Sequence, residues 1–192
     1  MKKVLIILLC SVFLIFGLYV WFTGIHAIPG KVKIIQSHET IYGKAVLFED
    51  KDNHTFGVAR LERYLAFFYR FGGSSYGHDV KKGMPFEATG YGTSDPPTDS
   101  FVIGVKVAAD SNIKYIAIGN DMEDVGYDES YELSMAEVQE NPEIYQWKSV
   151  VGHYAMFVVD EYTQETWTIR GFDESGNLIA DKRFAGQPRY LN

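Results

Sequence analysis

Residues 40–61 read TIYGKAVLFEDKDNHTFGVARL, and this stretch decides the fold because it specifies a β-hairpin. Residues 40–49 are extended and rich in β-branched and aromatic side chains, residues 50–53 are typical of a turn, and residues 54–61 return as the second strand. Another extended segment precedes them at residues 31–37. We therefore expect the first part of the chain to be antiparallel β-sheet.

Residues 60–71, which follow this hairpin, fit two patterns. An i, i+3, i+4, i+7 helical stripe can be drawn through Leu61, Tyr64, Leu65 and Phe68. The segment is also rich in aromatic residues and follows a strand, which favours extended structure. We predict two strand pieces with a bend near residues 63–65, ended by Gly72-Gly73-Ser74-Ser75, and keep a helix as the alternative.

The second half of the chain is also predicted to consist mainly of β-strands. Strands are predicted at residues 85–91, 101–108, 113–118, 154–160, 166–172 and 178–184. The turn 110–112 lies between two of them, and we expect the last three to form a three-stranded meander. Its final turn, residues 173–177, is well specified, since Asp173 can accept the turn amides and Gly176 can adopt a left-handed conformation.

A single short helix is predicted after the strand at residues 113–118. Ser134 is a suitable N-cap, and Glu137 stands three residues later, the arrangement of a capping box. Asn141 precedes a proline, which disfavours the helical conformation and ends the helix. The predicted fold class is α+β, mostly antiparallel β with hairpins, a C-terminal meander and one short helix, preceded by an N-terminal transmembrane helix.

The N-terminal transmembrane helix is predicted from residues 4–25, which contain 22 residues without a charge directly after Lys2 and Lys3. At about 1.5 Å per residue, such a helix is roughly 33 Å long, close to the thickness of the hydrocarbon core of a bilayer. The partner of this segment would be the lipid bilayer. The predicted organisation is a cytoplasmic leader (1–3), a signal anchor (4–25), a juxtamembrane linker (26–30) and an extracytoplasmic β-rich domain (31–192).

Cleavage near Ala27 followed by secretion is the less favoured alternative. The apolar run is longer than the roughly 7–15 residues of a signal peptide, and bulky Ile25 stands where a cleavage site prefers a small residue. The basic leader places the N-terminus inside, although Lys31 and Lys33 flank the other end of the span. We expect a single-pass protein of the cell membrane with its C-terminal domain outside.

The charge of the chain excludes some classes of partner. Of its 18 Lys+Arg, 16 remain after Lys2 and Lys3 are set aside, against 25 Asp+Glu, which gives a net charge of −9. Nucleic-acid binding depends on contacts between cations and phosphates, so we expect no nucleic-acid partner. The single cysteine is Cys10, and therefore the domain beyond the predicted span has no disulfide, zinc–thiolate site or catalytic thiol.

Two parts of the chain resemble known proteins. Residues 44–73 (KAVLFEDKDNHTFGVARLERYLAFFYRFGG) form the first, and residues 104–118 (GVKVAADSNIKYIAI) with residues 154–179 (YAMFVVDEYTQETWTIRGFDESGNLI) form the second. Together they are similar to small single-span or exported proteins of unknown function that are common in Bacillus-like Gram-positive bacteria. The resemblance implies an envelope location and a β-rich architecture, and it implies no active residue.

The segment GGSSYGHD, residues 72–79, gathers possible hydrolase groups, namely Ser74, Ser75, His78 and Asp79. A serine hydrolase needs its serine, histidine and carboxylate to converge from a rigid scaffold, and the chain has no G-x-S-x-G elbow. We therefore predict an ordinary hairpin loop. The enzyme alternative is an envelope hydrolase that pairs His78 or His153 with Asp79 or Asp160.

Residues 121–129 hold five carboxylates in nine residues and are the best candidate calcium site. The pattern fails as a twelve-residue calcium loop because Val125 occupies the fifth, liganding position. We predict a solvated acidic loop, and a calcium-binding surface domain is kept as an alternative. Asp50, Asp52 and Asn53 are a weaker candidate that better suits a turn.

The spacing of the histidines does not match that of a metalloprotease. We expect His38, His54, His78 and His153 to lie at the surface.

The aromatic residues Tyr64, Phe67, Phe68, Tyr69 and Phe71 form a run that fits either a stacking platform or a buried strand. We predict that they belong to the core, because large exposed apolar patches are uncommon. We assign no catalytic, cofactor or metal residue. The sequence favours a non-enzymatic binding, sensing or accessory module of the cell envelope, whose partner is another envelope protein or a cell-wall component.

Overall fold

The computed structural model describes residues 6, 9–17, 28–64, 68–93, 100–121, 125–126, 129, 131–184 and 186–191. In this part of the chain all strand pairings are antiparallel, and the strands form three sheets. Sheet A has the order β1-β2-β3-β4 and is built from β1 (Val32–Thr40), β2 (Gly43–Asp50), β3 (Thr55–Tyr64) and β4 (Phe68–Gly77).

Two further sheets complete the β structure. Sheet B has the order β5-β6-β9 and contains β5 (Phe86–Thr93), β6 (Ser100–Val107) and β9 (Tyr154–Val159). Sheet C has the order β12-β11-β10-β7-β8 and contains β7 (Tyr115–Ile118), β8 (Gln146–Ser149), β10 (Ile169–Phe172), β11 (Leu178–Lys182) and β12 (Arg189–Tyr190). The short helix α2 (Met135–Glu140) lies between β7 and β8 in the sequence.

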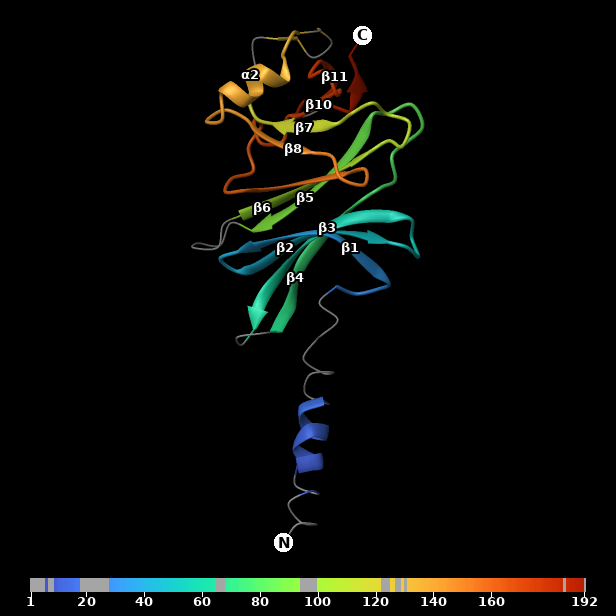
Figure 1. The fold of residues 1–192 in the computed structure, drawn as a ribbon, viewed down its shortest axis with the longest axis vertical. Helices are drawn as coiled ribbons and strands as arrows, with labels where there is room; N and C mark the ends of the chain where they lie inside the picture. Colours follow the sequence, from blue (N-terminus) through green and yellow to red (C-terminus); the bar gives the residue numbers. More distant parts are fainter. Residues whose placement is uncertain are drawn as a thin grey trace.

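The sheets are stacked in layers, with sheet B between sheets A and C and α2 on the outer side of sheet C (Figure 1). Alternate residues of β6 pack against sheet A and against sheet C. Val102 packs with Leu47 and Val58 of sheet A, and Ile103 packs with Ile116 of sheet C. β6 and β9 of sheet B lie between the other two sheets, and they are apolar almost throughout.

The predicted fold class is confirmed for the β architecture and for the short helix. The capping box of α2 is present, with the Ser134 Oγ accepting from the Glu137 amide at 3.2 Å and the Ser134 amide donating to Glu137 Oε2 at 2.7 Å. The helix ends at Glu140, and Asn141 is its C-cap. Ala117 and Phe172 of sheet C pack against Met135 and Val138 of the helix.

The predicted C-terminal meander is wrong in one strand. The hairpin of β10 and β11 forms as expected, and its turn is closed by Asp173, which accepts from the Asn177 amide at 2.8 Å. In contrast, β9 pairs with β6 in sheet B and not with β10. Five of the six residues of β9 are buried, because the strand lies in the middle layer. The turn at residues 110–112 likewise connects sheet B to sheet C.

The predictions for residues 60–71 and 72–75 have different outcomes. The two strand pieces predicted for residues 60–71, in preference to a helix, are present in the described residues, but they are antiparallel neighbours, β3 and β4, with Tyr64 opposite Phe68; residues 65–67 lie outside the described part of the chain. The Gly72–Ser75 segment does not end the unit or form a hairpin loop, since it lies within β4. A register shift near Gly72 accommodates the two adjacent glycines in the strand.

The N-terminal segment is described at residue 6 and at residues 9–17, which are helical and exposed. Within the described residues, no helix has both the length and the apolarity needed to cross a membrane. Much of the predicted span, namely residues 4–5, 7–8 and 18–25, lies outside the described residues. The span over residues 4–25 and the leader at 1–3 therefore stay predictions.

Candidate functional site

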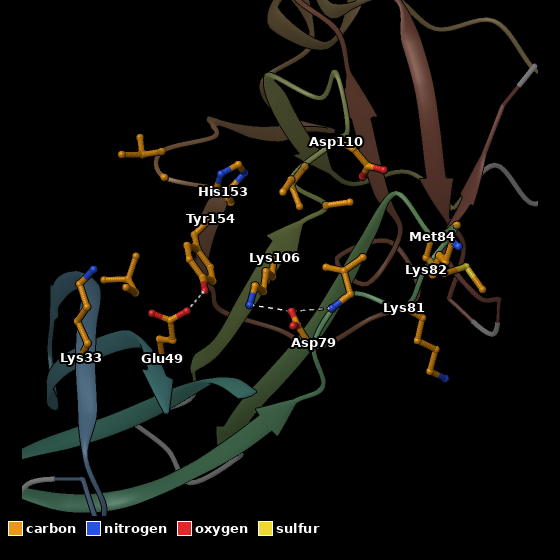
Figure 2. A pocket seen from close by; sticks show the side chains of 18 of the residues that line it. Lys33, Glu49, Asp79, Lys81, Lys82, Met84, Lys106, Asp110, His153 and Tyr154 are labelled. Atoms are coloured by element: carbon orange, nitrogen blue, oxygen red, sulfur yellow. Dashed lines mark hydrogen bonds and ion pairs between the residues drawn. The ribbon is translucent and has the colours of Figure 1, made fainter. Parts of the chain in front are cut away.

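An inter-sheet cleft of about 660 Å³ lies between sheets A and B. We use this name for the space enclosed by five segments: β1, Glu49 of β2, the β4–β5 connection (residues 79–84), the end of β6 with the residues that follow it (106–110), and the turn before β9 (151–154). Figure 2 shows that Lys106, Asp79, Glu49 and Tyr154 lie together at its centre.

An ion pair between Lys106 and Asp79 lies at the centre of the cleft, with 2.8 Å between Lys106 Nζ and Asp79 Oδ1. The Lys106 side chain is 17% exposed, whereas that of Asp79 is 63% exposed. The hydrogen bond from Lys106 holds the pKa of Asp79 below its ordinary value. Burial lowers the pKa of Lys106, but the hydrogen bond to Asp79 and the charge of Asp79 outweigh this effect, so this pKa is raised overall. Lys106 therefore stays protonated at neutral pH.

A second polar contact joins the two sheets beside this pair. Tyr154, which lies opposite Lys106 in the β6–β9 register, donates from its hydroxyl to Glu49 Oε1 at 3.1 Å. Lys106 Nζ is 5.7 Å from the centre of the Tyr154 ring. Burial is the largest cause that raises the pKa of Tyr154, so this phenol stays neutral. Neither Lys106 nor Tyr154 is thus available as a base or nucleophile.

The rim of the cleft carries additional charges. Lys33, Lys81 and Lys82 are exposed, and none of them has an ion-pair partner among the described residues. Figure 2 shows Lys33 on the β1 side of the cleft and Lys82 on the opposite side, while Lys81 extends away from Asp79. With the carboxylate of Asp110, the lining offers both ammonium and carboxylate groups to a ligand.

His153 reaches the rim from a tight turn that connects to β9. Val151 and Tyr154 exchange two backbone hydrogen bonds, of 2.9 and 3.0 Å, around Gly152 (φ 56°) and His153 (φ 73°). Two successive residues with positive φ are typical of a type I′ hairpin turn, in which Gly or Asn is usual at the place of His153. The turn holds the exposed imidazole beside Tyr154 (Figure 2).

The predicted hydrolase groups do not converge in the described part of the chain. Ser74 and Ser75 lie in β4, where Ser75 Oγ is hydrogen-bonded to Thr89 Oγ1 at 2.9 Å. His78 is exposed, and Asp79 pairs with Lys106 instead. The other described histidines, His38, His54 and His153, are also exposed as expected, and none is hydrogen-bonded to a serine or carboxylate there. Asp160 is exposed and lies outside the cleft lining.

The candidate calcium segment is described only in part, because residues 122–124 and 127–128 lie outside the described residues. Asp121 is buried and accepts a hydrogen bond from Thr168 Oγ1 at 2.8 Å, so it does not belong to a solvated loop. No group of three possible metal ligands occurs in the part of the chain that the structure describes. The weaker candidate is a turn as predicted, with Asp50 accepting from the Asp52 amide and from Asn53 Nδ2.

Of the described members of the aromatic run, Tyr69 packs against the core of sheet A, and the others are half-buried or exposed. Tyr64 and Phe71 are 36% and 41% exposed, and Phe68 and Tyr69 are half-buried; Phe67 lies outside the described residues. The prediction of burial is wrong for Tyr64 and Phe71, because Tyr64 is the last residue of β3 and Phe71 lies on β4, an edge strand of sheet A.

The sequence reasoning did not identify Lys106, Tyr154 or Glu49 as site residues. One signal was available for Lys106, which interrupts the apolar strand SFVIGVKV. A lysine in a strand that is covered on both faces needs a partner or an opening to water. Its position therefore marks the place where the two sheets separate.

No protein-family model matches the chain, and no curated protein or solved structure is significantly similar to it.

Proposed function

We propose that the chain is a single-pass module of the cell envelope that binds or senses a ligand, or supports another envelope protein, without catalysis. Residues 4–25 cross the membrane with the N-terminus inside, and the β-rich domain of residues 31–192 lies outside. The uncharged run, the basic leader and the exposed apolar helix at residues 9–17 support this location. The resemblance to single-span and exported proteins agrees with it.

One observation carries the binding role: the inter-sheet cleft is assembled from five segments, and its central polar groups are held in unreactive forms. Lys106 is an ammonium paired with Asp79, and Tyr154 is a neutral phenol bonded to Glu49. Such groups can orient a ligand by hydrogen bonds and charge, whereas a general base or nucleophile needs a free, activated atom. The cleft therefore supports binding better than hydrolysis.

The location is tested with single-cysteine variants in intact cells. Cys10→Ser removes the only cysteine, and Lys148→Cys or Lys2→Cys then adds one on either side of the predicted span; Lys148 is exposed on β8. A membrane-impermeant maleimide is expected to label the Lys148→Cys variant in intact cells and the Lys2→Cys variant only after lysis.

The opposite labelling pattern would show that the orientation is reversed. If neither variant were labelled in intact cells, the proposed extracytoplasmic location of the domain would be wrong. The intact mass of the purified protein decides between an anchor and secretion, because cleavage near Ala27 would remove the labelled residue 2.

For the binding role, a photo-crosslinking residue at position 82, on the rim of the cleft, is expected to give adducts in native membranes. The same residue at position 148 serves as the control.

A further inference from the structure

A second concavity lies at β5, the edge strand of sheet B, away from the inter-sheet cleft. We call it the β5 hollow; its volume is about 370 Å³, and β4, β5, the start of β6 and the β9–β10 connection line it. The side chains that decide its chemistry are Ser75, Thr89, Tyr91, Phe101, Tyr162 and Trp167. None of the residues that line the β5 hollow is ionisable at neutral pH, in a chain in which 22% of the residues are charged.

Tyr162 forms an exposed aromatic platform in the β5 hollow that is held in place by other rings. Its ring centre is 5.5 Å from that of Phe101, 5.2 Å from that of Trp167 and 6.4 Å from that of Phe184. Although these three rings contact it, Tyr162 remains 42% exposed. An aromatic ring fixed by its neighbours loses little conformational entropy when a ligand stacks on it.

Glycines bring the neighbouring rings close to the backbone of β5. A Cβ atom at Gly90 would lie 2.9 Å from Trp167 Cζ3, and one at Gly92 would overlap the ring of Phe101. On its other side, Trp167 is contacted by Lys182, whose Nζ is 4.8 Å from the centre of the ring. Side chains at positions 90 and 92 would displace the rings that support Tyr162, so these glycines shape the β5 hollow.

The side-chain hydroxyl groups of the β5 hollow have unused hydrogen-bonding capacity. Ser75 and Thr89 share one hydrogen bond of 2.9 Å, and the Tyr91 hydroxyl donates to the Gly72 carbonyl at 3.0 Å. Because each hydroxyl has one hydrogen and two acceptor positions, these contacts leave acceptor positions on all three groups and one donor on the Ser75–Thr89 pair. A ligand with several hydroxyl groups can use both kinds.

We propose that the β5 hollow binds a neutral saccharide, whose ring stacks on Tyr162 while its hydroxyl groups bond with Ser75 and Thr89. An uncharged lining disfavours ionic ligands, which would lose hydration without gaining a counter-charge. A sugar ring matches the lining because it combines an apolar C–H face with neutral hydroxyls at its edge. This site goes beyond the proposed function, since it is separate from the cleft and does not depend on the orientation of the chain.

The test measures sugar binding to the purified full-length chain in lipid nanodiscs, by calorimetry and by tryptophan fluorescence. The probes are glucose, N-acetylglucosamine, cellotetraose and chitotetraose, with sorbitol as a polyol that has hydroxyls but no ring. We expect saturable millimolar or tighter binding of at least one saccharide and none of sorbitol. The two sugar series distinguish a plain hexose from an N-acetylated one.

Matched variants locate the binding. Tyr162→Ala is expected to weaken it at least about tenfold, the usual result of removing an aromatic anchor. Tyr190→Ala is the control, because Tyr190 is equally exposed (43%) but lies on β12 and does not line the β5 hollow. Ser75→Ala, which removes one hydroxyl and little packing, is expected to weaken binding about threefold.

Three results would overturn the proposal: no saccharide binding up to about 50 mM, sorbitol binding as tight as that of the sugars, or equal losses in the Tyr162→Ala and Tyr190→Ala variants. A melting temperature measured for each variant excludes unfolding as the cause. The cysteine-labelling experiment reports only the topology of the chain, whereas the sugar-binding experiment reports only the β5 hollow. Failure of the proposed location is therefore distinguishable from failure of the proposed saccharide site.

Discussion

Gly104 lies at the centre of β6, where sheet A rests directly on sheet B. A Cβ atom at this position would be 2.6 Å from Leu47 Cδ1 and 2.7 Å from Val58 Cγ1, and both of these residues are fully buried. The glycine thus sets the distance between the two layers. A glycine is needed at this position because the two sheets approach each other closely. Turn geometry is not the cause, since Gly104 lies within a regular antiparallel ladder.

We expect Gly104→Ala to lower the free energy of unfolding by about 1–3 kcal/mol, the usual cost of overpacking a well-packed core. Urea unfolding followed by far-ultraviolet circular dichroism measures this change. Gly186→Ala is the control, because the added methyl group would have no neighbour closer than 3.5 Å. Equal stability of the two variants would mean that the layers separate easily at Gly104.

At the scale of single elements, α2 shows how far local sequence determines structure. The helix has only six residues, and its first turn is held by the reciprocal hydrogen bonds of Ser134 and Glu137. All the atoms involved lie within four residues of sequence, so the capping box was recognisable before any tertiary contact was known. The same holds for the turn at residues 50–53.

Ser134→Ala is expected to lower the free energy of unfolding by about 1 kcal/mol. The Glu137 amide loses its side-chain acceptor, and the hydrogen bond from the residue-134 amide to Glu137 loses its geometry. Chemical denaturation is the measurement, and hydrogen exchange of the α2 amides reports local fraying. The control is Ser149→Ala in β8, where the serine is exposed and has no side-chain hydrogen bond in the described structure. Unchanged exchange in α2 would show that packing on sheet C suffices to hold the helix.

The strand β9 shows where local reasoning fails. The apolar run at residues 154–160 predicts a strand, and local reasoning pairs it with the strand that follows it in the chain. An apolar run of this kind indicates burial on both faces, and only a middle layer provides that. The pairing with β6, about 50 residues earlier in the chain, follows from the match of apolar faces across the molecule.

At the scale of the whole molecule, polar contacts accompany the apolar core at the open end of the sheet A–sheet B interface. The ion pair of Lys106 with Asp79 ties β6 to the β4–β5 connection, and the hydrogen bond of Tyr154 with Glu49 connects sheet B to sheet A. Several carboxyl groups of the fold share one property: a side-chain hydrogen bond lowers the pKa, which is the case for Asp50, Asp79, Glu137 and Asp173.

These carboxyl groups make the fold sensitive to acid. A group whose pKa is lower in the folded than in the unfolded chain stabilises the fold above its unfolded pKa, here 3.8 for Asp and 4.5 for Glu. As pH falls below these values, the unfolded chain takes up protons first and the stabilisation is lost. The melting temperature is therefore expected to fall between about pH 5 and pH 3, as calorimetry can show.

Asp79→Asn provides the matched control for this acid dependence. The variant has no carboxyl group at position 79, so its melting temperature should fall less than that of the parent protein over the same pH range. Asp160→Asn removes an exposed carboxyl for which no pKa shift is resolved, and it should leave the slope unchanged. Identical slopes in all three proteins would contradict a contribution of Asp79.

The sequence by itself determined the β2–β3 and β10–β11 hairpins with their turns, the capped helix and the antiparallel β class, because each depends on residues that are close together in the chain. Only the tertiary structure decided that β9 joins the middle sheet, that Ser74 and Ser75 lie in a strand, and that Lys106 meets Asp79 while Tyr154 meets Glu49. The physical reason is that sheet order and cleft lining depend on which apolar faces fit together. That choice is made among segments distant in sequence, where local propensity carries no information.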